Sequence, residues 1–203
     1  MMIHRNIANS MNGSFVIYAV MALYLFSCSS KSEKLEADVD SMMGQEISIP
    51  YKELTSLTGT DKGSASANAD SLRYVYVSYL DLSECSPCYF SKLAEWDDIQ
   101  EMFMLARIPF ETVIIIETND KNTLALRRAY ESNGCQREVF LDKVNAFKGQ
   151  NKILPTDNRL HTFLLNSQNQ VVLIGDPVRN RRIKTLLKEY LETIEPKEKQ
   201  SSE

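Results

Sequence analysis

The stretch SYLDLSECSPCYFSKLAEW, residues 78–96, decides how the fold of this chain is interpreted. It places Cys85 and Cys88 three positions apart, between an apolar run and a segment with helical spacing. Residues 72–80 are rich in aromatic and β-branched side chains, as in a strand, whereas apolar residues within 89–103 recur at steps of three and four, as in a helix. Two thiols at a strand-to-helix junction can form a redox couple, half of a metal site or a structural disulfide.

The rest of the chain alternates between strand and helix patterns, and helical crossovers between strands imply parallel pairing with helices on both faces. The sequence therefore predicts a three-layer α/β sandwich with a central mixed sheet. The predicted elements are a strand over 44–57 with a turn at Pro50, a strand over 72–80, a helix over 85–108 stopped by Pro109, a strand over 110–117, a helix from the N-cap Asp120 to Gly134, a strand over 137–142, one helical turn at 144–147, a hairpin of 161–166 and 170–175, and a terminal helix over 180–194.

Composition fits one globular domain carrying tethers. Of 203 residues, 43% are hydrophobic and 25% charged, which is enough apolar material for one core. The net charge is -4 and charges of both signs are scattered along the chain. Since the sequence has no stripe of basic residues that could bind a phosphate backbone, nucleic acid is not expected as a partner.

The N-terminus is predicted to direct export. Residues 15–26 form an unbroken apolar run, shorter than the ~20 residues that span a bilayer. Leu25-Phe26-Ser27-Cys28 resembles a bacterial lipobox, which implies cleavage after residue 27 and acylation of Cys28. The alternative is a plain secretory signal or a short uncleaved anchor. The predicted organisation is a signal peptide over 1–27, a flexible polar tether over 28–43, a folded domain over 44–194 and a disordered tail over 195–203.

The folded part resembles the thioredoxin fold, and within it the exported TlpA-like branch. The resemblance covers residues 44–194 and rests on the CSPC motif at its junction, the extra strand 139–142 and the strand 162–165 that opens the hairpin. It implies a thiol–disulfide oxidoreductase that acts on protein thiols and disulfides without a cofactor. As a lipoprotein, it would be held at a membrane of the bacterial cell envelope, with the domain outside the cytoplasm.

The resemblance also implies roles for the two thiols. Cys85 would be the nucleophile, since unpaired N–H groups at a helix start stabilise a thiolate. Cys88, one turn later, would resolve the mixed disulfide. Glu84 stands where thioredoxins usually have tryptophan, and its carboxylate should raise the pKa of the neighbouring thiol. A raised thiol pKa suits a reductant or isomerase better than a strong oxidant.

A second departure concerns the strand that faces the dithiol in thioredoxins. A cis-proline precedes that strand in the family, whereas this chain has His161, and Pro155 lies too early to replace it. His161 has two interpretations. Its ring could simply bond a backbone group, or it could face Cys85 and Cys88 and shuttle the thiol proton.

If His161 does face the thiols, a metal site is an alternative to redox exchange. Cys85, Cys88 and His161 would suit Cu(I) or Zn²⁺, because both ions accept thiolate and imidazole ligands. Copper-delivery proteins of the Sco type are similar in fold but space their cysteines one residue wider. A non-catalytic binding module on an inherited scaffold is a third possibility.

Other residues carry weaker predictions. An odd number of cysteines remains once Cys28 is acylated, and Cys135 is interpreted as a spare or buried thiol. Asp81 and Glu84 could relay protons to the resolving thiol or could be solvated loop acids. Trp96 and the tyrosines at 74, 76 and 79 are predicted to lie in the core or on the sheet faces.

Overall fold

The structure is a computed structural model that describes residues 32–59, 73–82, 86–134 and 137–194. The chain divides into two compact units, residues 1–40 and 41–203. The predicted signal peptide over 1–27, the lipidation site Cys28 and the predicted tail over 195–203 lie outside the described residues. No described helix is both long and apolar enough to cross a bilayer.

Residues 32–42 are helical, where the sequence predicts a flexible tether. No glycine or proline occurs between 32 and 43, so the backbone has no helix breaker there. Gly44 then takes a left-handed φ of 74°, and this conformation ends the helix. The polar composition of this segment therefore reflects an exposed helix rather than an irregular tether.

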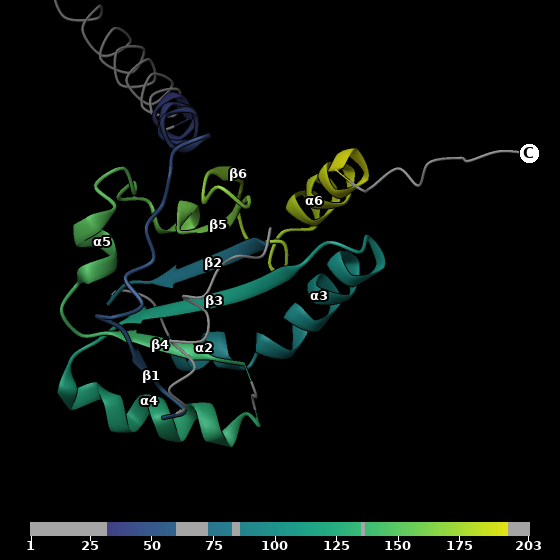
Figure 1. Ribbon diagram of the computed structural model, residues 1–203. Helices are drawn as coiled ribbons and strands as arrows, with labels where there is room; N and C mark the ends of the chain where they lie inside the picture. Colours follow the sequence, from purple (N-terminus) through teal and green to yellow (C-terminus); the bar gives the residue numbers. More distant parts are fainter. Residues whose placement is uncertain (1–31, 60–72, 83–85, 135–136, 195–203) are drawn as a thin grey trace, which may run out of the picture. The chain divides into compact units, whose positions relative to one another are not determined.

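A six-stranded mixed sheet forms the centre of the second unit (Figure 1). Its central strands β2, β3 and β4 are parallel, and β1, β5 and β6 are antiparallel to their neighbours. In the order in which they lie across the sheet, the strands are β1 (Thr55–Ser56), β4 (Val139–Asp142), β3 (Phe110–Glu117), β2 (Tyr74–Leu80), β5 (Thr162–Leu165) and β6 (Val171–Ile174). The predicted parallel crossovers and antiparallel hairpin are confirmed.

The helices follow the predicted order with one interruption. They are α2 (Ser86–Phe90), α3 (Trp96–Leu105), α4 (Asp120–Ser132), α5 (Ala146–Gln150) and α6 (Arg181–Ile194), with 3₁₀ turns η2 (Leu93–Glu95) and η3 (Asn158–Leu160). The prediction of one continuous helix over 85–108 is wrong. Ser91 Oγ donates to the carbonyl oxygen of Cys88 at 2.9 Å, and such side-chain bonds compete with the helical backbone where α2 ends.

Two predicted boundaries also change. Asn119, rather than Asp120, caps α4, because its side chain accepts a hydrogen bond from the Asn122 N–H. The segment 44–57 is largely irregular, with one bridge from Glu46 to Gln170 and the two-residue strand β1. The chain does turn at Pro50, whose carbonyl accepts the Glu53 N–H at 2.9 Å, and that turn prevents a continuous strand.

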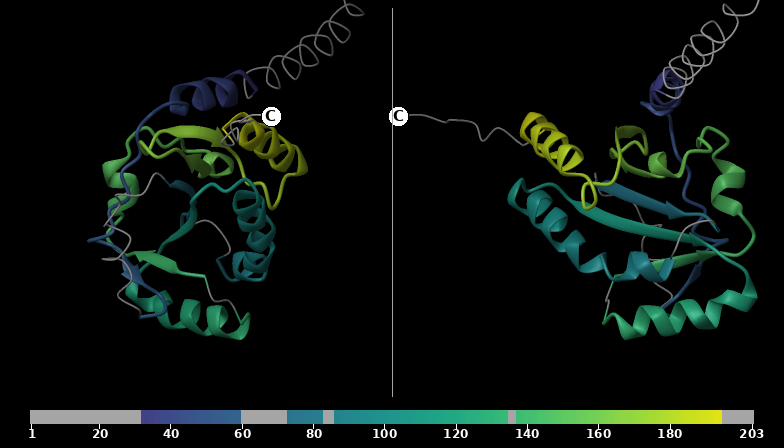
Figure 2. Two further views of the ribbon diagram at one scale, coloured as in Figure 1. Left: turned by 45° about the vertical axis from the view of Figure 1, so that its right-hand side comes forward. Right: turned by 180° about the vertical axis from the view of Figure 1, so that it is seen from behind.

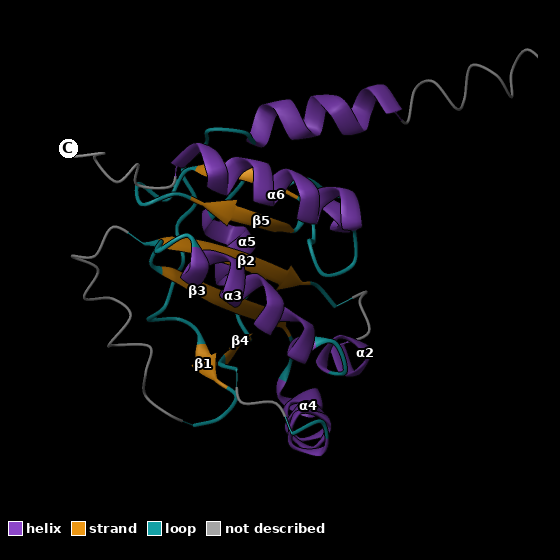
Figure 3. Ribbon diagram, turned by 90° about the vertical axis from the view of Figure 1, so that its right-hand side faces the viewer, coloured by secondary structure: helices purple, strands orange, loops and turns teal. Residues whose placement is uncertain are grey.

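The sheet separates two sets of helices. Alternate residues of a strand point to opposite faces, and Tyr76 and Leu80 of β2 join the buried cluster shared with α2, α3, α4 and α6. Tyr79 instead packs on Phe147 of α5, with ring centroids 5.1 Å apart. Figure 2 and Figure 3 show α5 on the side of the sheet opposite to α3 and α6. The predicted three-layer sandwich is thus confirmed.

Candidate functional site

The candidate site lies where β2 ends and α2 begins. Cys88 lies in α2, is exposed, and is disulfide-bonded. Residues 83–85, with Glu84 and Cys85, lie outside the described residues, as do Cys28 and Cys135. The disulfide partner of Cys88 therefore also lies outside them. Cys88, exposed in the helix that follows the central strand β2, is accessible to another protein.

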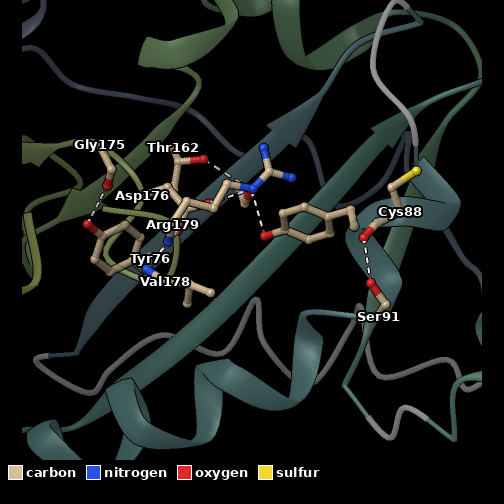
Figure 4. A network of polar contacts seen from close by, with 10 residues as sticks. Tyr76, Cys88, Ser91, Thr162, Gly175, Asp176, Val178 and Arg179 are labelled. Atoms are coloured by element: carbon tan, nitrogen blue, oxygen red, sulfur yellow. Dashed lines mark hydrogen bonds and ion pairs between the residues drawn. The ribbon is translucent and has the colours of Figure 1, made fainter. Parts of the chain in front are cut away.

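Three hydroxyl groups connect α2 to the sheet beneath it. Tyr89, next to Cys88, donates its phenol hydrogen to Ser78 Oγ of β2 at 2.8 Å. Ser78 Oγ in turn lies 3.2 Å from Thr162 Oγ1 at the start of β5. Burial raises the pKa of Tyr89 above its ordinary value, so its hydroxyl remains a donor. The helix that carries Cys88 is thus tied to both β2 and β5 (Figure 4).

A second group of polar contacts covers Tyr89 from the side of α6. The guanidinium carbon of Arg179 lies 5.2 Å from the centre of the Tyr89 ring. Asp176 holds Arg179 in place, because its carboxylate accepts the Arg179 N–H at 3.1 Å and lies 3.5 Å from Nε. Tyr76 donates to the neighbouring Gly175 carbonyl at 2.7 Å, and burial raises its pKa. The loop before α6 therefore supports α2 as well as the sheet (Figure 4).

His161 lies on the other face of the sheet. Its carbonyl accepts the Tyr79 N–H at 2.9 Å, one position beyond the antiparallel pair Ser78 and Thr162. Residues opposite each other in such a ladder point to the same face, so His161 faces α5 with Tyr79, while Thr162 faces α2. The His161 ring packs 5.4 Å from the Tyr79 ring and is fully buried.

The bonds of His161 are those of a structural histidine. Nε2 lies 2.8 Å from the carbonyl oxygen of Pro155, and Nδ1 has no hydrogen-bond partner among the described residues. These contacts match the first of its two interpretations, a ring that bonds a backbone group. The ring points to the face opposite Tyr89 and α2, so the structure does not bring His161 to the Cys88 side of the sheet.

The loop before β5 approaches the end of β2 from the side. Asn158 Nδ2 donates to Asp81 Oδ1 at 3.3 Å, which joins η3 to the residues that follow β2. Asp157 caps η3 by accepting the Arg159 N–H at 3.0 Å, and the Arg159 side chain lowers the pKa of that carboxyl through a hydrogen bond. None of the described peptide bonds is cis, so the loop forms without the cis-proline of thioredoxins. Asp81 is half-buried, and its carboxylate bonds Asn158 in the loop before β5.

The other sequence predictions have structural outcomes. Trp96, Tyr76 and Tyr79 are buried, as expected for core residues. The described residues contain no group of three His, Cys, Asp or Glu side chains arranged to hold a metal ion. Sequence reasoning missed Ser78, Thr162 and Arg179; the alternation of β2 and β5 was the only signal that could have identified the first two.

Comparison with known proteins identifies the fold. No protein-family model and no curated protein matches the sequence. Among solved structures, a candidate protein disulfide isomerase from Bacteroides thetaiotaomicron aligns over 74% of this chain and 88% of its own, with 15% identity and a TM-score of 0.50.

Two further structures are similar at lower TM-scores. A domain from Cytophaga hutchinsonii, described as a candidate thiol-disulfide isomerase, gives a TM-score of 0.48 at 15% identity over 76% of this chain and 97% of its own. A thioredoxin-like protein from Porphyromonas gingivalis gives 0.47 at 17% identity over 78% and 99%. From its sheet order, its crossovers and the Bacteroides likeness, we conclude that this chain has a thioredoxin-like fold.

Proposed function

We propose that this chain is a thiol–disulfide oxidoreductase of the bacterial cell envelope, with Cys85 and Cys88 as its exchanging pair. The observation that carries the proposal is the exposed, disulfide-bonded Cys88 at the start of α2, beside the carboxyl end of β2. The thioredoxin-like fold supports the proposal, because the CSPC motif of residues 85–88 lies at the junction between β2 and α2. Substrates are protein thiols and disulfides, and acylated Cys28 holds the domain at a membrane, outside the cytoplasm.

The proposed reaction balances without a cofactor. In the reduced protein, the Cys85 thiolate attacks one sulfur of a substrate disulfide and forms a mixed disulfide, while the other substrate sulfur leaves as a thiolate. The Cys88 thiolate then attacks Cys85 Sγ, which releases the second substrate thiolate and leaves a Cys85–Cys88 disulfide. Two electrons pass to the substrate. Glu84 favours the reductant or isomerase direction, because its carboxylate disfavours an unusually stable Cys85 thiolate.

The hydroxyl chain below α2 supports the same proposal through geometry. Tyr89 is the residue after Cys88 and its hydroxyl is fixed to Ser78 and, through it, to Thr162. A resolving thiol must reach the mixed disulfide in a defined direction, and a helix anchored one residue later limits its movement. Within the part of the chain that the structure describes, no comparable contact favours the Cu(I) or Zn²⁺ alternative, since the His161 ring lies on the α5 face.

Thiol variants test the redox assignment. The assay measures how fast the reduced full chain reduces a disulfide-bonded substrate protein. Cys85→Ser should abolish this activity. Cys88→Ser should accumulate a mixed disulfide with the substrate, and added reductant should release the substrate from it. Cys135→Ser is the matched control and should reduce substrate like the parent. If Cys85→Ser and Cys88→Ser both keep parental turnover, the pair is not the exchanging site, and a full chain without exchange would be a non-catalytic binding module.

Anchoring is tested separately. Expressed in a Gram-negative host fed radiolabelled palmitate, the parent should incorporate label and Cys28→Ser should not. Cys135→Ser again serves as the control. Label that persists in Cys28→Ser would contradict acylation at that residue without affecting the redox assignment.

A further inference from the structure

A groove separates α3 from α6, on the sheet face that also carries α2. Its volume is about 580 Å³, within the ~300–1,000 Å³ typical of small-molecule sites. The apolar part of its lining is formed by Met102 and Leu105 of α3 and by Leu191 of α6. Leu105 is 70% exposed, so this wall has no cover among the described residues. An exposed apolar groove of this size is a candidate ligand site.

Three of the four charged side chains that line the same groove are cationic, and the fourth is the carboxylate of Glu192 at its far end. Arg181, Lys184 and Lys188 lie at successive turns of α6 and all line it. Lys184 pairs with Asp98 of α3 at 3.0 Å, which joins the two helices across the groove. Arg181 and Lys188 form no ion pair with a described residue. Two unpaired cations beside an apolar wall fit a ligand with an anionic head and an apolar body.

The dimensions favour one acyl chain over a protein partner. From Arg181 to Glu192 the groove follows α6 for about 16 Å, at 1.5 Å per residue. Nine residues line it, whereas a stable protein interface uses roughly 20–30 residues a side. The length of the groove matches an extended hydrocarbon chain of medium length. Figure 1 and Figure 3 show α3 and α6 as neighbouring helices of the fold.

We propose that this groove binds a single-chain fatty acid. The hydrocarbon chain lies on Leu105, Met102 and Leu191, and the carboxylate is held between Arg181 and Lys188. Cys88 is not among the residues that line the groove, and the proposal does not rest on the proposed redox function.

Photo-crosslinking of the full chain tests the proposal. A laurate analogue with a diazirine in its chain is added to protein held in nanodiscs of neutral phosphatidylcholine, and labelled peptides are mapped by mass spectrometry. Labelling should saturate and should map to α3 and α6. Unlabelled laurate should compete, whereas lauryl alcohol, which has the same chain and no charge, should compete about tenfold less well, as expected for the loss of two ion pairs.

Matched surface variants separate the two halves of the site. Arg181→Gln with Lys188→Gln should weaken labelling about tenfold, and Arg127→Gln with Arg128→Gln, which removes equal charge from exposed positions of α4, should leave it unchanged. Leu105→Ser should also weaken labelling. Its control is Leu124→Ser, another exposed leucine on α4.

Three outcomes would overturn the proposal. Equal competition by lauryl alcohol would remove the role of the carboxylate. Labelling that is unchanged in the Arg181 and Lys188 double variant, or that maps outside α3 and α6, would place the ligand elsewhere. Finally, unlabelled laurate could fail to compete while a change from neutral to anionic lipid abolishes labelling. That result would show that the cations bind a membrane surface instead of a fatty acid.

Discussion

Replacement of His161 by alanine should destabilise the protein without slowing thiol exchange. The imidazole is fully buried and bonds the Pro155 carbonyl at 2.8 Å. Its removal loses a hydrogen bond worth ~1 kcal/mol, leaves that buried carbonyl without its donor at ~1–2 kcal/mol, and opens a cavity beside Tyr79. We expect a loss of about 3 kcal/mol in the free energy of unfolding, and a Tm lowered by about 6–12 °C.

The assay pairs unfolding with exchange. Urea unfolding gives the stability, and the rate of disulfide reduction is measured at a temperature well below both midpoints. His161→Phe is the companion variant, since it fills the space, loses the bond to Pro155 and also removes the unpaired Nδ1. It should recover part of the stability with the parental rate. A tenfold or larger loss of rate in both variants, at unchanged Tm, would refute the placement of His161 on the face away from the thiols.

The remaining predictions concern the anchor of α2 and the loop before β5. Tyr89→Phe removes the bond to Ser78 at 2.8 Å and should lower the unfolding free energy by about 1–2 kcal/mol in urea titration; an unchanged midpoint would show that the hydroxyl does not stabilise the fold. Asp157 has a lowered pKa because Arg159 bonds its carboxylate, so the ion pair stabilises the folded state above the ordinary value of 3.8 and is lost as the pH falls through the lowered value. Asp157→Asn should therefore lower the free energy of unfolding only slightly near neutral pH, since the pair is largely exposed to solvent, and not at all once the pH is below the lowered pKa; a cost that persists in acid would contradict the linkage.

The spacing of apolar residues correctly predicted the elements that are held by continuous apolar contacts. β3 is a run of isoleucines and valine covered on both faces, and it begins and ends at the predicted residues, 110 and 117. α6 shows a continuous apolar face and also appears where predicted, within a residue of its start. In both cases the core contacts alone decide the structure. The pattern of apolar residues therefore suffices.

Elements decided by single polar contacts were predicted less well. The helix after the cysteines breaks where Ser91 bonds the Cys88 carbonyl, although the apolar spacing continues across the break from Tyr89 to Trp96. α5 is fixed by buried Asp142, whose carboxylate accepts the N–H groups of Ala146 and Phe147 at 2.8 and 2.9 Å. Sequence spacing shows which side chains can be buried, but not which hydrogen bonds the backbone will prefer.

The register of one antiparallel pair decides which residues of the candidate site meet. His161 and Thr162 are adjacent, and a shift of one residue in the pairing of β5 with β2 would exchange their faces. The observed register sets Thr162 opposite Ser78 and turns His161 toward Tyr79. The register could not be deduced from the sequence. The imidazole of His161 therefore suggested proton transfer with the thiols, a role that its position does not support. On the α2 face, Tyr89 bonds the neutral hydroxyl of Ser78 and packs against the guanidinium of Arg179, and neither group supplies a base. Proton transfer during exchange would then depend on the thiols, the acids beside them and water, and this is why the exchange rate should survive the loss of the imidazole.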